Sequence, residues 1–250
     1  NQNPNVILIY TDDQGYGDVS ALNPEAKFET PNIDRLVKEG IFFTDGHCSD
    51  TVCTPSRYGI LTGRYSWRTK LKSGVMGSEG KCLIDDNRFT LASLFKKYDY
   101  RTAMIGKWHL GMQFPGAKGD RDWSKPIQDG PTEKGFDYFY GLPASMNFGI
   151  LTYIENKSIT EKPDLWTAKK ESEEAINDFR FKPPYENTSD LNQEYVNDLP
   201  IEVAPGFKDS EALTILTDKA LEWLDDTVQE DQESPFFLYL PYTSPHKPVC

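Results

Sequence analysis

A continuous apolar run at residues 5–11 constrains the fold of this chain more than any other feature of its sequence. The run reads Asn5-Val6-Ile7-Leu8-Ile9-Tyr10-Thr11. An uninterrupted apolar segment of this length is typical of a strand that is buried on both faces of a parallel sheet. Such a sheet needs helices against both faces, so the rest of the chain should alternate strands with helices.

The sequence after this run has that alternation. A helix is expected at 31–39, with Thr30 as N-cap, Pro31 in its first position and Gly40 at its end. The other expected elements are helices from about Pro55 to about Gly63, after Thr90 and at 209–228, and strands at 101–106, 136–140, 150–155 and 236–240. The order predicts an α/β fold with a mostly parallel central sheet and helices on both faces.

The charge balance and the hydropathy pattern exclude several classes of partner. The net charge is −12, from 27 basic and 39 acidic residues, which argues against nucleic acid and anionic membranes as partners. No apolar run approaches the ~20 residues of a membrane-spanning helix, so we expect none. The four cysteines are too few for a disulfide scaffold, and a Cys48–Cys82 bridge stays an open possibility. The N-terminus at Asn1 is that expected of a mature or trimmed chain.

Reactive side chains follow three of the expected strands. Asp12 and Asp13 come after the first strand, Lys107 and His109 after the strand at 101–106, and His246 after the strand at 236–240. Ligands of open α/β sheets bind beyond the carboxyl ends of the strands. The strand predictions therefore bring two carboxylates, one ammonium group and two imidazoles to the same edge of the sheet.

Each of these residues also has a purely structural interpretation. Two aspartates before Gln-Gly commonly form a solvated turn, although adjacent carboxylates also supply oxygen ligands for Ca²⁺ or Mg²⁺. A lone histidine such as His109 is often a structural residue. The chain has only three histidines, and the third, His47, is assigned a structural role.

The segment Cys53-Thr54-Pro55-Ser56-Arg57, continued by Leu61-Thr62-Gly63-Arg64, is the most informative. It places a thiol at the start of a helix, where free N–H groups and the helix dipole favour an anion. Arg57, one turn later, adds a cation suited to a tetrahedral oxyanion. On chemistry alone, a buried and inert structural cysteine is an equally good interpretation.

This segment resembles the signature of the type I sulfatases, in which a maturation enzyme oxidises the cysteine to formylglycine. Five further blocks are similar to that family: Asn5 to Asp18, Thr30 to Leu36, Gly106 to Gly111, Gly135-Phe136-Asp137 with Gly141 and Ser145, and Ser244-Pro245-His246. The resemblance implies an alkaline-phosphatase-like sulfatase fold. It also implies that residues 1–250 are the N-terminal part of a catalytic domain whose C-terminal subdomain is absent.

The resemblance assigns a nucleophile and a cation site. Cys53, as hydrated formylglycine, would supply the nucleophilic oxygen after conversion by a formylglycine-generating enzyme. Asp12, Asp13 and the converted Cys53 would bind a divalent cation, Ca²⁺ or alternatively Mg²⁺. The family's remaining metal ligands would follow residue 250, so this chain alone is expected to carry an incomplete cation site.

The resemblance also assigns the residues that handle the sulfate. Arg57 would steady the formylglycine, and Lys107 and His246 would contact the sulfate, with His246 helping the alcohol to leave. His109 would take a proton from the second hydroxyl of the hydrate. Ser145 is a further expected substrate contact.

The implied activity is hydrolysis of sulfate esters, on a sulfated glycan or an aryl sulfate, to an alcohol and inorganic sulfate by a periplasmic or secreted enzyme. Two alternatives stay open, a phosphodiesterase or phosphonate monoester hydrolase and an inactive sulfoglycan-binding protein in which Cys53 is never converted. Six aromatic residues within 112–160 could line a sugar subsite or, more simply, pack in the core: Phe114, Trp123, Tyr138, Tyr140, Phe148 and Tyr153.

Overall fold

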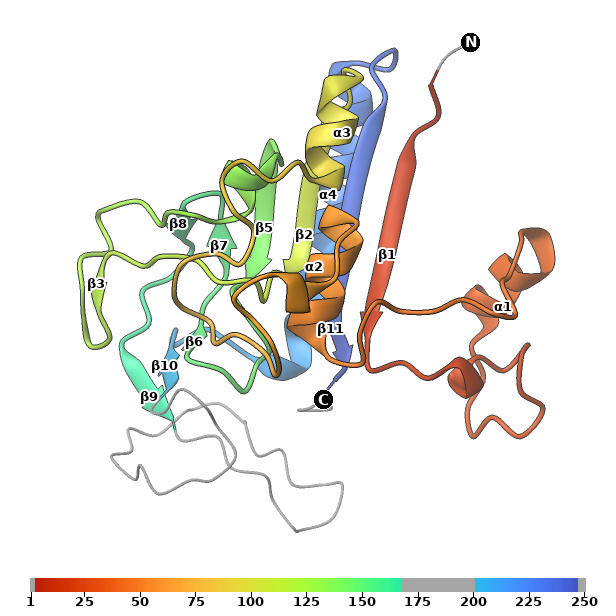
Figure 1. The fold of residues 1–250 in the computed structure, drawn as a ribbon, viewed down its shortest axis with the longest axis horizontal. Coiled ribbons are helices and arrows are strands. Elements are labelled where there is room, and N and C mark those ends of the chain that lie inside the picture. Colours follow the sequence, from red (N-terminus) through yellow and green to blue (C-terminus); the bar gives the residue numbers. More distant parts are fainter. Residues whose placement is uncertain (1–2, 168–200, 247–250) are drawn as a thin grey trace.

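A six-stranded sheet forms the centre of the computed structural model, which describes residues 3–167 and 201–246 (Figure 1). In spatial order the strands are β1 (Val6–Asp12), β11 (Phe236–Pro245), β2 (Arg101–Lys107), β5 (Tyr138–Leu142), β7 (Ile154–Glu155) and β8 (Ser158–Ile159). The first four run parallel to one another, β7 pairs antiparallel with β5, and β8 pairs antiparallel with β7. The predicted mostly parallel sheet is therefore confirmed.

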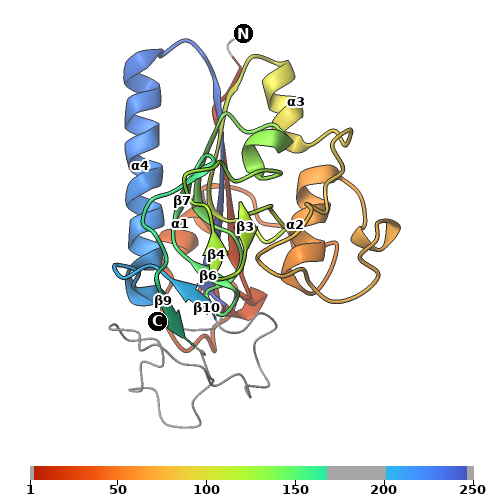
Figure 2. The same ribbon diagram turned by 90° about the vertical axis from the view of Figure 1, so that its left-hand side faces the viewer.

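Helices cover both faces of this sheet, as Figure 2 shows from the side. On one face lie α2 (Cys53–Thr62) and α3 (Leu91–Lys97), and on the other lies α4 (Ala212–Glu230). The side chains of β11 alternate between the two layers: Phe237 and Tyr239 belong to the core under α2 and α3, and Leu238 and Leu240 to the core under α4. This period of two is that of a strand buried on both faces.

The first strand differs from its prediction in burial. Residues of β1 alternate between partly buried and exposed positions, with Ile7 48% and Ile9 54% exposed. The expectation that this strand is buried on both faces is wrong for the described residues. β1 lies at the end of the sheet, beside β11, and α4 packs on β11, β2 and β5 instead.

The predicted helices are found with small shifts in their ends. α1 (Pro31–Glu39) has the predicted bounds, but the Thr30 side chain makes no capping hydrogen bond and no α1 residue is buried. α2 begins at Cys53, two residues before Pro55, and ends at Gly63 in the left-handed conformation that favours glycine (φ 63°). The predicted helix at 209–228 is a short 3₁₀ turn, Asp209–Glu211, followed by α4.

The remaining elements are short. The predicted strand at 136–140 is β5, and that at 150–155 is divided into β6 (Ile150–Leu151) and β7. Short 3₁₀ turns lie at Tyr16–Asp18, Ser66–Arg68 and Pro131–Lys134. The strands β3 (Gly116–Ala117) and β4 (Asp120–Arg121) pair with each other. The strands β9 (Leu165–Thr167) and β10 (Ile201–Val203) form a three-stranded sheet with β6. No helix among the described residues is long and apolar enough to cross a membrane.

Two glycines bring three strands close together just before their carboxyl ends. Gly106 of β2 pairs with Gly141 of β5. A Cβ atom on Gly141 would lie 1.8 Å from the Gly106 carbonyl oxygen, and one on Gly106 would lie 2.1 Å from the Pro241 carbonyl oxygen of β11. Gly106 also has a φ of 141°, a backbone conformation that residues with a side chain rarely adopt. This glycine contact sets the strand spacing immediately before Lys107.

Candidate active site

The carboxyl ends of β1, β2 and β11 meet the N-terminus of α2. Asp12 is the last residue of β1, Lys107 is the last residue of β2, and Cys53 is the first residue of α2. His246 follows directly after β11. The segments that carry the predicted site residues thus end at the same edge of the sheet, in the lower central part of Figure 1.

Asp12 is the centre of a buried ionic network. Its Oδ2 accepts hydrogen bonds from Lys107 Nζ and from Arg57 Nη2, the latter at 3.1 Å. Asp12 is 6% exposed, and the side chains of Arg57 and Lys107 are 1% and 0% exposed. Burial alone would raise the pKa of Asp12, but the charges of Lys107 and Arg57 outweigh it and lower the pKa. Asp12 is therefore ionised at neutral pH.

Arg57 holds three segments at the site. In addition to Asp12, its guanidinium donates to the backbone carbonyls of Lys107 (2.7 Å) and Tyr242 (3.1 Å). It also lies 5.7 Å from the centre of the Tyr10 ring. Because these partners belong to β1, β2 and β11, Arg57 links the ends of three strands. It also offsets the negative charge of Asp12.

Lys107 is a buried ammonium group between two charges of opposite sign. Burial and the neighbouring Arg57 lower its pKa, whereas Asp12 and Cys53 act in the other direction, and the net effect is a lowered pKa. A cation held in this way is preorganised to stabilise negative charge on a bound anion.

Cys53 lies half-buried at the first turn of α2. Burial raises the pKa of its thiol, but the hydrogen bond with His246 and the charge of Lys107 outweigh burial, so that the pKa is lowered. The same groups would stabilise any anionic oxygen or sulfur at this position. Cys53 is thus partly exposed and lies beside Lys107 and His246.

His109 has a defined tautomer. Its Nε2 donates to the Met76 carbonyl oxygen at 2.8 Å, because a carbonyl only accepts, and Nδ1 therefore carries a lone pair. Nδ1 is buried without a hydrogen-bond partner among the described residues. Burial, followed by the charges of Lys107 and Arg57, places the pKa of His109 well below 6.5. His109 is thus a neutral imidazole with a free acceptor nitrogen.

The loop that follows β5 lies against His109. The backbone N–H of His109 donates to the Pro143 carbonyl. The Phe148 ring meets the His109 ring edge-on, with 4.9 Å between the ring centres. Ser145 lies on this loop, is 1% exposed, and has a hydroxyl without a hydrogen-bond partner among the described residues. Ser145 is therefore joined to the cluster through its neighbours rather than through a direct contact with Asp12 or Lys107.

The second aspartate is placed differently from the first. Asp13 is 59% exposed on its side chain, has a φ of 64°, and its Oδ2 is 3.8 Å from His246 Nε2. Asp12 and Asp13 offer oxygen ligands of the kind Ca²⁺ prefers, but Ca²⁺ takes about six to eight such ligands. In residues 3–167 and 201–246, no group of three or more His, Cys, Asp or Glu side chains is arranged to hold a metal ion. The described residues therefore do not make a complete cation site.

Several contacts at the site were not predicted from the sequence. Met76 and Thr54 fix His109, since the Thr54 hydroxyl donates to the His109 carbonyl (2.8 Å). Behind Cys53, the Ser56 hydroxyl bonds to Tyr10 and lies 2.6 Å from the Cys48 sulfur. Thr54 and Ser56 belong to the Cys53–Arg57 motif, which was the available signal, whereas nothing in the sequence marks Met76.

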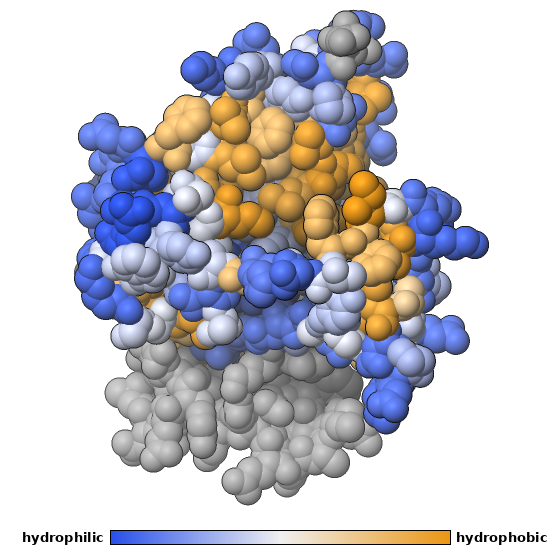
Figure 3. Space-filling model, turned by 45° about the vertical axis from the view of Figure 1, so that its right-hand side comes forward, coloured by the Kyte–Doolittle hydropathy of each residue, from blue (hydrophilic) through white to orange (hydrophobic). Residues whose placement is uncertain are grey.

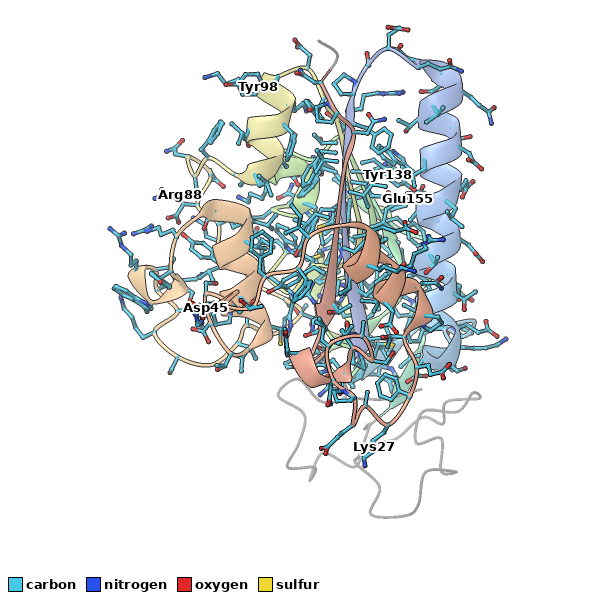
Figure 4. All side chains as sticks on the ribbon, turned by 90° about the vertical axis from the view of Figure 1, so that its right-hand side faces the viewer. Lys27, Asp45, Arg88, Tyr98, Tyr138 and Glu155 are labelled. Atoms are coloured by element: carbon cyan, nitrogen blue, oxygen red, sulfur yellow. The ribbon has the colours of Figure 1, made fainter. Side chains whose placement is uncertain are left out.

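Three residues considered from the sequence make no described contact with Asp12, Lys107 or His109. Cys48 and Cys82 are free thiols, so the possible bridge between them is not formed. His47 is at the surface, where it pairs with Asp45 (2.8 Å), which is labelled in Figure 4. Of the six aromatic residues considered above as a sugar subsite, Tyr138 and Trp123 pack against the core, and the other four are buried: Phe114, Tyr140, Phe148 and Tyr153.

The neutral state of His109 predicts a pH-dependent stability. Its pKa is well below 6.5 in the folded chain and about 6.5 in the unfolded chain, so the unfolded chain binds more protons as the pH falls through 6.5. Between pH 7.5 and 5.5 the free energy of unfolding should fall by ~1.4 kcal/mol through His109 alone. Urea titrations at both pH values would measure this loss. His109→Gln should remove it and the exposed His47→Gln should retain it, and an unchanged loss in His109→Gln would contradict the assignment.

The sulfatase family model matches residues 4–250 of the chain. An N-acetylgalactosamine-6-O-sulfatase of Bacteroides thetaiotaomicron is 32% identical over 99% of this chain and 49% of its own length. Arylsulfatase G of Mus musculus is 30% identical over 98% of this chain and 42% of its own length. The chain therefore spans about half the length of the curated relatives it matches over nearly its whole extent.

Solved structures give the same result for the fold. A Bacteroides thetaiotaomicron structure described in connection with the metabolism of multiple glycosaminoglycans superposes with a TM-score of 0.75, at 28% identity, over 99% of this chain and 52% of its own. A phosphonate monoester hydrolase of Agrobacterium radiobacter has a TM-score of 0.51 at 18% identity, which shows a shared fold only. Because the sulfatase family model matches residues 4–250, the chain belongs to the sulfatase family.

Proposed function

We propose that this chain forms part of an enzyme that hydrolyses sulfate esters to an alcohol and inorganic sulfate, with a nucleophile derived from Cys53. The observation that carries the proposal is the surroundings of Cys53, which begins a helix and interacts with the cation Lys107 and with His246. These groups favour negative charge at the position where a sulfate oxygen would develop it.

The side chains of this site divide into binding and proton-transfer roles. Lys107 and His246 bind the sulfate oxygens, and His246 donates a proton to the departing alcohol oxygen. His109 takes up a proton on Nδ1, which has a lone pair and is fixed by the Nε2 hydrogen bond to Met76. Arg57 holds β1, β2 and β11 in register and neutralises Asp12. Ser145 adds a hydroxyl contact to the substrate.

Two further components complete the proposal. A formylglycine-generating enzyme would oxidise Cys53 to formylglycine. The hydrated aldehyde of formylglycine would then carry a hydroxyl group able to attack the sulfur atom of the sulfate ester. Asp12, Asp13 and the converted Cys53 would contribute to a site for Ca²⁺ or Mg²⁺ whose other ligands lie outside the described residues. The buried position of Lys107 beside Asp12 and the free Nδ1 of His109 support the proposed roles of these two residues.

The proposed substrate is a sulfated glycan. Two relatives that align with 99% of this chain are named as sulfatases of N-acetylgalactosamine 6-sulfate groups, one from Bacteroides thetaiotaomicron and one from Mus musculus. A periplasmic or secreted location is proposed with this substrate, because such glycans are extracellular.

Sulfate release by the full-length protein, co-produced with a formylglycine-generating enzyme, tests this function. The panel should contain an aryl sulfate, glycans sulfated at different positions and a phosphate diester, with released sulfate and phosphate measured by ion chromatography. Faster release of sulfate than of phosphate supports the proposal. Faster turnover of the phosphate diester would favour the phosphodiesterase alternative, and an unconverted Cys53 thiol in protein from its native source would favour a glycan-binding role.

A further inference from the structure

A buried ionic network lies on the side of the molecule away from β1. Its members, here named the Arg121 clamp, are Arg121 of β4, Glu202 of β10 and Glu79 of the segment between α2 and α3. Figure 2 looks onto this side and shows β3, β4, β6 and β10 there. Exposed apolar side chains gather instead beside β1, on the side of α2 and α3 (Figure 3). The clamp is thus separate from that apolar surface and needs its own explanation.

The guanidinium of Arg121 lies between two carboxylates. Its Nε is 2.8 Å from Glu202 Oε2, and its Nη2 is 2.8 Å from Glu79 Oε2. The side chains of Arg121 and Glu202 are 1% and 3% exposed. The guanidinium also lies over the rings of Phe114 (5.1 Å) and Trp123 (5.7 Å). Burial would lower the pKa of Arg121, but the hydrogen bonds to Glu79 and Glu202 outweigh burial and raise the pKa, so the guanidinium stays charged.

Glu79 belongs to the segment that fixes the tautomer of His109. It follows Met76 by three residues, and the Met76 carbonyl accepts the hydrogen bond from His109 Nε2 (2.8 Å). The next residue, Gly80, donates its N–H to the Met112 carbonyl (2.9 Å), so this segment runs alongside the chain that follows His109. An anchor on Glu79 therefore fastens the end of the short segment whose carbonyl holds the imidazole.

Glu202 is joined to a second segment that contacts His109. Its backbone N–H donates to the Gly149 carbonyl (2.9 Å), and β10 pairs with β6 directly afterwards. Gly149 follows Phe148, whose ring meets the His109 ring edge-on. The Phe148 N–H in turn donates to the Ser145 carbonyl (3.0 Å). An anchor on Glu202 therefore fastens the loop that packs against the imidazole.

The cost of burying these charges indicates a role in geometry. Taking a guanidinium and a carboxylate out of water is expensive, and packed apolar side chains are often at least as stable in such positions. An arginine fork, however, binds carboxylates only in a narrow range of orientations, so it fixes the segments that carry them. Here Arg121 joins two segments that contact His109, and it packs on Phe114 in the chain that follows His109.

We propose that Arg121 is a positioning residue for His109. Through its two carboxylate partners it holds the segments that contact the imidazole, and Nδ1 of His109 thereby keeps its lone pair for a proton. This inference rests on the proposed hydrolysis of sulfate esters, in which His109 takes up a proton. Loss of the clamp should release the Met76 carbonyl, allow both neutral tautomers of the imidazole and reduce the fraction that can accept a proton on Nδ1.

Arg121→Met and Glu79→Ala, each made in the full-length protein, test this proposal. Arg121→Met should lower kcat for sulfate release by ~10²-fold and Glu79→Ala by ~10-fold, with KM within ~2-fold of the parent, because a displaced catalytic group slows the chemical step more than it weakens binding. Glu79→Ala is the milder variant, since the Glu79 side chain is 37% exposed and the pair between Arg121 and Glu202 remains.

The nitrogen signals of the histidine rings report the state of His109 without a measurement of activity. In full-length protein labelled with ¹⁵N in its histidine rings, comparison with His109→Gln identifies the two His109 signals. The parent should show one protonated nitrogen and one nitrogen with a lone pair. Both Arg121→Met and Glu79→Ala should move the two signals toward each other, because the tautomers then mix.

Arg101→Met is the matched control. Arg101 begins β2, at the opposite end of the strand from Lys107, and its guanidinium donates to the Asp231 carbonyl (2.8 Å). Its loss should lower the Tm and leave both kcat and the His109 signals unchanged. The proposal is wrong if Arg121→Met behaves in the same way, or if it raises KM and leaves kcat unchanged. A parent protein that releases no sulfate would contradict the proposed function instead, and the His109 signals would still decide the role of Arg121.

Discussion

Replacing Cys53 by alanine should reduce sulfate release by the full-length protein by at least ~10³-fold, with little change in its fold. The substitution removes the thiol that must be oxidised to give formylglycine, so no hydrated aldehyde can form, while the interactions that hold the site together are made by Arg57, Lys107 and Asp12. The surviving cations should still bind the sulfate group, so that kcat falls far more than KM changes. Initial rates over a range of substrate concentrations would separate the two effects.

Cys82→Ala is the matched control for this experiment. Cys82 is 2% exposed, and burial raises the pKa of its thiol to about 12, so it is an inert thiol in the core. Its replacement should cost some stability through a small cavity and leave kcat close to that of the parent. If Cys53→Ala retained more than about a tenth of the parent rate, the nucleophile would lie elsewhere and the proposed mechanism would be wrong.

Replacing Asp12 by alanine should destabilise the folded chain by ~3–5 kcal/mol, the usual cost of removing one partner from a buried ion pair. Lys107 and Arg57 would be left as two like charges, both almost fully buried, without the carboxylate that offsets them. The loss should appear as a lower urea concentration at the unfolding midpoint, while the slope of the unfolding free energy against urea concentration stays unchanged.

The neighbouring aspartate provides the control for stability. Asp13→Ala removes a 59% exposed carboxylate that lies 3.8 Å from His246, so its effect on the free energy of unfolding should stay within ~0.5 kcal/mol. Equal destabilisation by both substitutions would mean that the buried network around Asp12 does not stabilise the fold. Asp12→Asn, which keeps the shape of the side chain, should fall between the two because it retains a hydrogen-bond acceptor without the charge.

Local signals in the sequence were sufficient to predict most of the sheet and the helices that carry the site. The apolar runs at β1 and β11 predicted strands because a short uninterrupted apolar run is a local signal, and Pro31 and Gly63 marked helix ends through their own backbone preferences. The Asp12–Asp13 pair, Lys107 and His246 reached one edge because parallel strands share the direction of their carboxyl ends.

The details that could not be predicted depend on contacts between distant residues. Arg57 bonds to the carbonyl of Tyr242, 185 positions away, and Met76 fixes the tautomer of His109 through a backbone oxygen, which any residue type would supply. The exposure of Ile7 and Ile9 was also missed, because an apolar run predicts a strand without stating which neighbours cover it.

The contact between Gly106 and Gly141 has a consequence for the way such sequences drift. Any side chain at either position would collide with backbone, at Pro241 or at Gly106, and backbone does not yield as the tip of a flexible side chain would. A gene copy released from selection for catalysis would therefore be free to lose Cys53 or His109 long before it could lose these glycines. Their retention in a descendant would report only that its sheet still folds, whereas retention of Cys53 would be the informative mark of an active lineage.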